Sequence, residues 1–338
     1  INLTTKKKET ISIVGESGSG KTSLIMLIGG LEKTTSGKIF FQNHEITKLS
    51  EDEVSEIRRK NIGIIFQSFY LIPNYTAVEN VALTLELNKL KNPEKEAKQL
   101  LDRFGLSHRF NNLPSQLSGG EQQRVAIARA LAPNPKLMLM DEPFTSLDNR
   151  LRDEIRELTL SLLIEERTSV ILVTHDPEEA MKVSDSIALM REGSIVQKGA
   201  PYNVYNKPVD SKAAKFLSNY NKIEGIVNNA QTETPFGLFM TPGLQDGVIA
   251  EIIIRPQHLK IDFDRNGKGP SPTSEHGVAA RGQVVRSRFL GKESLVELKM
   301  EFDQSILKAS VPGVFLPPSG INLWISVRRD RCFVFVKD

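Results

Sequence analysis

One run of residues, from Gly15 to Thr22, has the composition and spacing of a phosphate-binding loop. Its glycines allow the backbone to curl so that N–H groups face an anion, and the start of the following helix adds partial positive charge. Lys21 is suited to reach the β- and γ-phosphates of a nucleotide, and Thr22 can offer its hydroxyl to Mg²⁺. The residues predicted to surround the phosphates are Gly15, Glu16, Ser17, Gly18, Ser19, Gly20, Lys21, Thr22 and Ser23.

A second pair of chemically active residues, Asp141 and Glu142, follows the apolar run Leu137–Met140. Two adjacent carboxylates at the end of a buried strand are unfavourable unless a cation or a substrate interacts with them. Asp141 is suited to hold Mg²⁺, directly or through water, and Glu142 is suited to polarise a water molecule that attacks a phosphate. With the phosphate loop, this pair indicates nucleotide hydrolysis.

The segment Leu117–Arg124 carries the most specific pattern in the chain, Leu-Ser-Gly-Gly-Glu-Gln, and it lies between the two segments described above. In this order, the motifs resemble those of the ATP-binding-cassette (ABC) ATPases. The resemblance implies that Ser118, Gly119, Gly120 and Gln122 begin a helix whose N-terminus points at the γ-phosphate of ATP held by another subunit. Two copies of the chain would then enclose two ATP molecules head to tail.

The same resemblance assigns roles to three further residues. Gln67, after the run Ile64–Phe66, corresponds to a glutamine that touches Mg²⁺ and water and links to the membrane subunit. Asp148 belongs to a loop that crosses the dimer interface, and His175 corresponds to a histidine that contacts the γ-phosphate. The resemblance therefore implies a catalytic set of Glu142, His175 and Gln67, with ATP and Mg²⁺ as ligands.

One part of the family pattern is absent, namely the aromatic residue that stacks on adenine upstream of the phosphate loop. Only fourteen residues precede Gly15, and none of them is aromatic. The chain also begins without methionine, and Ile1–Leu3 has the pattern of a strand. We therefore expect the N-terminal strands and the adenine-stacking residue to lie in a segment upstream of this sequence.

The elements that must position these residues alternate between strands and helices. Ile11–Val14 and Ser169–Val173 are short apolar runs typical of buried parallel strands, and Ser23–Ile28 has the pattern of a helix. This alternation predicts an α/β fold with a mainly parallel sheet and, by the resemblance, a helical subdomain over residues 1–222.

Residues 223–338 have a different pattern, with short β-like runs separated by proline and glycine turns. This pattern predicts a small all-β, OB-like barrel. Ile254–Leu259 and Arg288–Gly291 resemble elements of the regulatory (TOBE-like) domain found in many importer ATPases. Cys332 is the one cysteine, and we interpret it as a packing residue within an apolar strand.

Composition excludes several classes of protein. With 39% hydrophobic and 25% charged residues the chain is of ordinary globular type, and no apolar run is long enough to cross a bilayer. A net charge of +3 is too small to argue for nucleic-acid binding. Only 120 positions separate Lys21 from Asp141, which leaves no space for the coiled coil of DNA-repair ABC proteins.

Among ABC proteins, three classes compete. The segment Ile62–Asn80 resembles exporter ATPases of the lipoprotein-release type, whereas Asp141–Asp148 and the added β domain resemble importer ATPases. A soluble ATPase that acts on nucleic acid is the third class, and we expect no nucleic-acid partner. The importer prediction implies a homodimer, separate transmembrane permease subunits, an extracytoplasmic solute-binding protein as an indirect partner, and a peripheral location on the cytoplasmic face of the inner membrane.

Two short segments direct the substrate prediction. Thr234–Gly237 and Phe289–Ser294 are most similar to ferric-iron importer ATPases, so ferric iron is the predicted solute. Polyamine, sulfate, phosphonate and sugar importers remain the alternatives, because the solute never meets this subunit and its identity is weakly encoded here.

Overall fold

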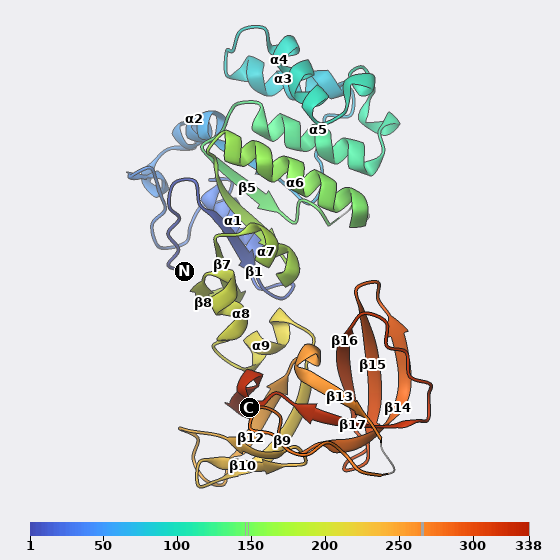
Figure 1. Ribbon diagram of the computed structural model, residues 1–338. Helices are drawn as coiled ribbons and strands as arrows, with labels where there is room; N and C mark the ends of the chain where they lie inside the picture. The colour runs from blue at the N-terminus through green and yellow to red at the C-terminus, as the bar shows by residue number, and fades with distance from the viewer. Residues whose placement is uncertain (146, 148, 265–266, 338) are drawn as a thin grey trace. The chain divides into compact units, whose positions relative to one another are not determined.

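The computed structural model describes residues 1–145, 147, 149–264 and 267–337. It divides into two compact units, Ile1–Lys207 and Pro208–Asp338, which are described separately (Figure 1). The first unit contains most of the helices, and the second is built mainly of strands. The division predicted near residue 222 concerns functional domains and stays a prediction.

A six-stranded sheet forms the centre of the first unit, in the order β4-β5-β6-β1-β7-β8. All neighbouring strands run parallel except β7 and β8, which form an antiparallel hairpin. The mainly parallel sheet confirms the predicted α/β class. The strands of this unit are β1 (Thr10–Val14), β2 (Phe40–Phe41), β3 (His44–Glu45), β4 (Ile62–Ile65), β5 (Leu137–Asp141), β6 (Ser169–Thr174), β7 (Ser186–Arg191) and β8 (Ser194–Gly199), of which β2 and β3 pair separately.

The helices of the first unit begin at residues suited to capping. Ser50, Thr76 and Ser118 each accept a backbone N–H from a glutamate three residues later, whose carboxylate in turn accepts the N–H of the capping residue. The helices are α1 (Lys21–Ile28), α2 (Glu51–Asn61), α3 (Ala77–Leu87), α4 (Pro93–Arg103), α5 (Gly119–Leu131), α6 (Asn149–Glu165), α7 (Pro177–Val183) and α8 (Pro201–Asn206), with 3-10 helices at Ile46–Lys48, Ser107–Arg109 and Pro114–Gln116.

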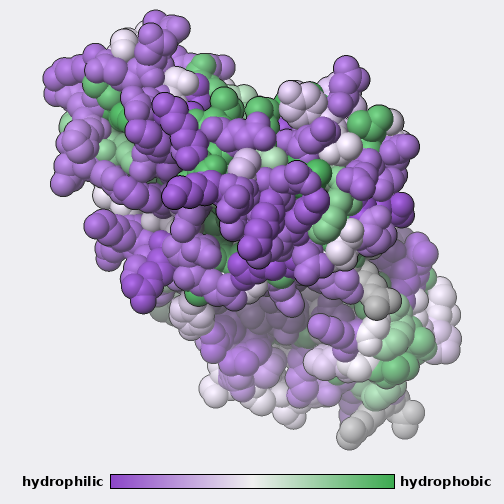
Figure 2. Space-filling view, turned by 90° about the horizontal axis from the view of Figure 1, so that it is seen from above, coloured by the Kyte–Doolittle hydropathy of each residue, from purple (hydrophilic) through white to green (hydrophobic). Residues whose placement is uncertain are grey.

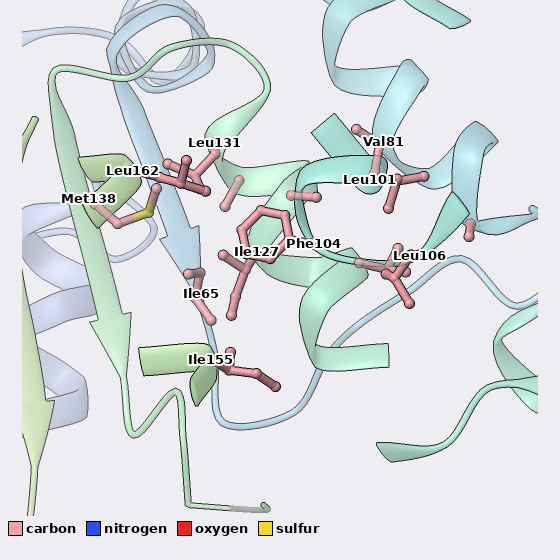
Figure 3. Close-up of a cluster of buried hydrophobic side chains, with 14 of the residues drawn as sticks. Ile65, Val81, Leu101, Phe104, Leu106, Ile127, Leu131, Met138, Ile155 and Leu162 are labelled. Carbon is pink, nitrogen blue, oxygen red and sulfur yellow. The ribbon is translucent and has the colours of Figure 1, made fainter. Parts of the chain in front are cut away.

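A hydrophobic core joins α3, α4, α5 and α6 to the sheet (Figure 3). Val81 comes from α3, Leu101 from α4, Ile127 from α5, Leu162 from α6 and Met138 from β5. All five side chains are buried. Burial of aliphatic side chains of this size stabilises the fold by about 1.5–3 kcal/mol each. The core therefore holds the helix that follows Ser118 firmly against the strand that ends at Asp141.

Two five-stranded antiparallel sheets form the second unit, in the orders β11-β10-β9-β12-β18 and β13-β17-β14-β15-β16. Phe236, Ile252, Val296 and Ile325 belong to the core between them. This unit confirms the predicted all-β fold. Its elements are α9 (Ser211–Leu217), β9 (Asn221–Asn228), β10 (Gln231–Thr234), β11 (Gly237–Met240), β12 (Ile249–Ile254), β13 (Leu259–Phe263), β14 (Ala280–Phe289), β15 (Glu293–Met300), β16 (Ile306–Pro312), β17 (Asn322–Val327) and β18 (Phe333–Val336), with 3-10 helices at Pro256–His258 and Arg329–Arg331.

Several arginines of the second unit are paired with carboxylates. Arg281 contacts Asp264 at 2.6 Å, Arg288 contacts Glu297 at 2.5 Å, and Arg328 contacts Glu275 at 2.9 Å. These contacts place a carboxylate beside three of the basic residues of this unit. Burial raises the pKa of the Cys332 thiol to about 12, and its Sγ donates to the carbonyl of Arg328 at 3.3 Å, as expected for a packing residue.

The predicted strand at Ile1–Leu3 is wrong, because the first strand of the described chain begins at Thr10. Leu3 packs against the core around β1 through its side chain, without the ladder of backbone hydrogen bonds that a strand requires.

Figure 2 shows a face that is mostly hydrophilic, with small separate apolar areas. Among the described residues, no helix is both long enough and apolar enough to cross a membrane.

Candidate nucleotide site

The phosphate loop connects β1 to α1, as its sequence predicts. Gly20 caps α1 with φ of 96°, a left-handed conformation that favours glycine. The Nζ of Lys21 donates to the carbonyls of Gly15 at 3.0 Å and Glu16 at 2.7 Å, and to Oγ of Ser19 at 3.2 Å. The ammonium group of Lys21 therefore lies inside its own loop and donates hydrogen bonds to three oxygen atoms of that loop.

The charge of Lys21 is placed in a buried environment. The side chain is 6% exposed, and burial lowers the pKa of its ammonium group, while the carboxylates of Glu142 and Asp141 oppose that shift. A buried cation near two acids is well suited to exchange its loop contacts for the oxygens of a phosphate. Its surroundings thus connect the phosphate loop to the acidic end of β5.

Gly15 allows the loop to approach β7 closely. A Cβ atom at this position would lie 2.2 Å from the carbonyl oxygen of Met190. Further along the same neighbourhood, the N–H of Gly193 donates to the carbonyl of Ser19 at 3.1 Å. The loop is therefore held against the hairpin of β7 and β8, a contact that the local sequence pattern did not indicate.

Replacing Gly15 by alanine is expected to destabilise the first unit by about 1–3 kcal/mol and to weaken nucleotide binding, because a backbone oxygen cannot move aside cheaply. Gly199→Ala is the matched control, because a Cβ there would lie 3.5 Å from its nearest neighbour, Cγ2 of Val204, which is an ordinary van der Waals distance. Thermal unfolding and ATP titration of both variants measure the effect. Equal stability and affinity in the two variants would contradict the role given to the contact between Gly15 and Met190.

Thr22 and Asp141 meet at the edge of the sheet where the parallel strands end. Oγ1 of Thr22 donates to Oδ1 of Asp141 at 3.2 Å, across 119 positions of sequence. Burial raises the pKa of the Asp141 carboxyl, the nearby Glu142 raises it further, and the Thr22 hydroxyl and Lys21 lower it. Because burial disfavours the charged form of the Asp141 carboxylate, a cation bound beside it would stabilise that form.

This pair of oxygen donors fits Mg²⁺. Magnesium prefers oxygen ligands and is usually held by one or two protein groups together with substrate phosphates and water. In the described part of the chain, no group of three or more His, Cys, Asp or Glu residues could hold a metal ion. Thr22 and Asp141 therefore suit a metal that is shared with a nucleotide.

Glu142 and His175 form a second contact at the same edge. Nδ1 of His175 lies 3.0 Å from Oε1 of Glu142, and the histidine follows β6 while the glutamate follows β5. Glu142 has φ of 47°, an uncommon conformation for a residue with a side chain, and its N–H donates to the carbonyl of Val173 at 2.9 Å. The backbone is thus fixed in a strained form that presents the carboxylate beside His175.

Gln67 lies two residues beyond β4 and is exposed. Because Ile65 of β4 pairs with Met140 of β5, Gln67 belongs to the same edge of the sheet as Asp141. Within the described chain its side chain makes no hydrogen bond. The structure therefore brings Gln67 to the correct edge, and its role stays a prediction.

Ser118 caps α5, and its partner Glu121 is fixed from two sides. The N–H of Ser118 donates to Oε2 of Glu121 at 2.8 Å, and Nε of Arg109 donates to Oε1 at 2.9 Å. The amide of Gln122 donates to the carbonyls of Pro114 at 3.0 Å and Leu117 at 3.1 Å, so it supports the preceding loop. These contacts leave the start of α5 rigid.

The structure brings together the predicted residues in two groups. Lys21, Thr22, Asp141, Glu142 and His175 are linked by the contacts described above. Between the segment of residues 118–122 and the loop of residues 15–22, no hydrogen bond or ion pair occurs in the part of the chain that the structure describes. The predicted residue Asp148 lies outside the described residues, as does Ser146.

One residue that sequence reasoning missed supports the loop after β5. Arg152 on α6 donates from Nε to the carbonyl of Phe144 at 3.1 Å and from Nη2 to that of Leu147 at 2.9 Å. An arginine on a predicted helix is ordinarily interpreted as a solvated charge, so no local signal pointed to this contact. It fixes the chain directly after Glu142.

Comparisons with known proteins match both units. The family described as ABC transporter matches residues 1–145, and the TOBE domain matches residues 252–335. Similar relatives include the spermidine/putrescine import ATP-binding protein PotA of Thermotoga maritima, 40% identical over 82% of this chain and 77% of the relative. The glucose import ATP-binding protein GlcV of Saccharolobus solfataricus is 34% identical over 100% of this chain and 94% of its own.

Two further proteins extend the comparison. The sulfate/thiosulfate import ATP-binding protein CysA of Gloeobacter violaceus is 34% identical over 91% of this chain and 82% of the relative. Among solved structures, the dimeric post-hydrolysis state of the ATP-binding cassette MJ0796 bound to ADP and Pi is 39% identical. It covers 60% of this chain and 89% of that chain, with a TM-score of 0.56.

Proposed function

This chain belongs to the family of ABC transporter ATP-binding subunits with a C-terminal TOBE domain, and we propose that it couples ATP hydrolysis to solute import through separate permease subunits. The observation that carries the proposal is the convergence of Thr22 with Asp141 and of Glu142 with His175 at one edge of the sheet. These contacts join the phosphate loop to the acids that hydrolysis requires.

Each residue at this edge has a role in the proposed reaction. Lys21 exchanges its loop carbonyls for the β- and γ-phosphate oxygens of ATP. Glu142 accepts a proton from the attacking water, and His175 orients Glu142 and contacts the γ-phosphate. Mg²⁺ bound by Thr22 and Asp141, with Gln67 nearby, would neutralise charge that develops on the phosphate oxygens.

Phosphate release from purified protein tests this proposal. With ATP and Mg²⁺ the chain is expected to release phosphate, and removal of Mg²⁺ by a chelator is expected to stop it. Lys21→Ala is the matched control, because it removes the phosphate contact and leaves the remaining acids in place. Phosphate release that persists both without Mg²⁺ and in the Lys21→Ala variant would contradict the proposed site.

We propose that two copies of the chain form the active unit, each supplying Ser118 to the ATP on the partner's phosphate loop. The absence of a hydrogen bond or ion pair between those segments within the described chain supports a second copy as the source. The dimeric form of the solved cassette named above supports it further. The permease subunits and an extracytoplasmic binding protein complete the proposed transporter, with this chain on the cytoplasmic face of the membrane.

The solute is the finer part of the proposal. The named relatives are import ATP-binding proteins for spermidine/putrescine, glucose and sulfate/thiosulfate, which favours import over lipoprotein release. Neither the comparisons nor the structure supports ferric iron. The two segments behind that prediction are hairpin turns, since Thr234 Oγ1 accepts the N–H of Phe236 and Leu290 donates to the carbonyl of Glu293. Their sequence serves turn geometry, so we propose import without naming iron.

We further propose that residues 1–222 hydrolyse ATP and that residues 223–338 regulate. A chain ending at residue 222 is expected to release phosphate at a rate comparable to that of the full chain, because every residue assigned to the reaction precedes it. Circular dichroism verifies folding, and the same shortened chain with Lys21→Ala supplies the background rate. Loss of hydrolysis in a folded shortened chain would contradict this division.

A further inference from the structure

Arg129 makes a contact that the proposed reaction does not use. This residue lies in the last turn of α5, and its guanidinium reaches the loop between β4 and α3. Nη1 donates to the carbonyl of Tyr70 at 2.6 Å, and Nη2 donates to the carbonyl of Phe69 at 2.9 Å. The two bonds form a fork on consecutive peptide groups, an arrangement that lysine cannot reproduce.

The guanidinium group of Arg129 has these two carbonyls as its hydrogen-bond partners. The side chain is partly buried, and burial lowers the pKa of its guanidinium. No carboxylate of the described residues lies within ion-pair distance of it. Leaving a partly buried cation without partners is costly, so the two carbonyls are strongly held, and hydrogen bonds to a charged group are among the stronger ones.

The loop that Arg129 holds is strained and carries Gln67. Tyr70 has φ of 45° and is 68% exposed, and its ring packs edge to face on Phe66 at 5.5 Å between centroids. At the other end of the loop, buried Asn80 binds the backbone of Ile72, with its Oδ1 accepting the N–H at 2.8 Å. Gln67 and Ser68 therefore lie in the segment between the end of β4 and the carbonyls that Arg129 binds.

We infer that Arg129 is a positioning residue that ties the Gln67 loop to the helix whose first turn is the Ser118 segment. Because α5 rises about 1.5 Å per residue, it spans roughly 16 Å between these two ends as one rigid element. A displacement of the Ser118 end is therefore passed to Phe69 and Tyr70, and from there to Gln67. The inference deepens the proposed function and rests on it for the role of the nucleotide.

Hydrogen exchange followed by mass spectrometry, carried out on the full chain, tests whether Arg129 holds the Gln67 loop in place. Without nucleotide, Arg129→Gln is expected to raise exchange in residues 68–75 at least tenfold, and Arg129→Lys, which keeps the charge and one bond, is expected to raise it less. Arg152→Gln is the matched control, because it releases two carbonyls of a different loop. Unchanged exchange in residues 68–75 in both folded Arg129 variants would overturn the inference.

A second arm tests transmission in a Glu142→Gln background, where bound ATP is expected to persist. Addition of ATP and Mg²⁺ should slow exchange in residues 118–124 and in residues 66–75 together. With Arg129→Gln the first response should remain and the second should fall at least threefold; if this variant does not fold, Arg129→Lys takes its place. An ATP response of residues 66–75 that is as large with Arg129→Gln as with native Arg129 would overturn the inference. Failure of ATP to bind, measured separately by titration, would count against the proposed function and leave the first arm decisive.

Discussion

Glu142→Gln is expected to slow ATP hydrolysis by about 10²- to 10⁴-fold, the contribution typical of a general base. Glutamine keeps the size and shape of the side chain but cannot accept the proton of the attacking water. The amide can still contact His175, which lies 3.0 Å from the carboxylate in the native chain. The loss should therefore appear in the rate of the chemical step, measured as single-turnover phosphate release.

ATP binding is expected to survive the same substitution, because Lys21, Thr22 and Asp141 are unchanged. The proposed dimer should then persist with ATP bound, since hydrolysis is needed to open it. Size-exclusion chromatography with ATP and Mg²⁺ detects this state, and Glu178→Gln, the same chemical change at an exposed residue that has no role in the site, is the control. Near-normal turnover in Glu142→Gln would move the role of base to His175.

Lys21→Ala and Ser118→Arg are each expected to abolish hydrolysis when every chain carries the change. The first removes a charge-assisted contact to the phosphates, and loss of such a preorganised donor costs about 10²- to 10³-fold in rate. The second places a bulky cation at the start of α5, where the N-cap hydroxyl accepts the N–H of Glu121. Phosphate release by each pure variant measures both effects, and retained activity in either would remove that residue from the site.

The local chemistry of the site could be predicted from the sequence because its motifs are contiguous. The phosphate loop, the acids after β5 and the capped start of α5 each occupy a few successive residues. Their meeting could also be predicted, because parallel strands place their carboxyl ends at one edge of a sheet. The contact between Thr22 and Asp141 is the direct outcome of that rule.

The supporting contacts could not be predicted, because they join residues that are far apart in sequence. Arg129 and Phe69 are 60 positions apart, and Gly193 reaches Ser19 from a hairpin on another part of the chain. Such bonds depend on the order of strands and the placement of helices, which no local pattern specifies. The conformation of Glu142 is likewise set by its tertiary surroundings.

The solute prediction failed to gain support for a related reason. Turn residues such as Thr234 and Gly291 are selected by backbone geometry, with Gly291 at φ of 95°, so their resemblance to one group of importers carries little chemical information. Residues that touch the solute belong to other subunits of the proposed transporter. Sequence similarity in the ATPase therefore identifies the reaction more sharply than the cargo.

The central claim, that each ATP is held between Lys21 of one copy and Ser118 of another, is tested most directly by mixing chains. Equal amounts of Lys21→Ala and Ser118→Arg chains should recover about a quarter of wild-type phosphate release, because half of the dimers are mixed and each has one intact site. The matched control mixes wild-type chains with chains that carry both changes, whose mixed dimers should have no intact site. About a quarter of wild-type release in each mixture is the predicted result, because in the control only the wild-type homodimers, about a quarter of all dimers, stay active. No release in the first mixture, with about half of wild-type release in the control mixture because each wild-type chain would then act alone, would contradict the claim and place the whole site within a single chain.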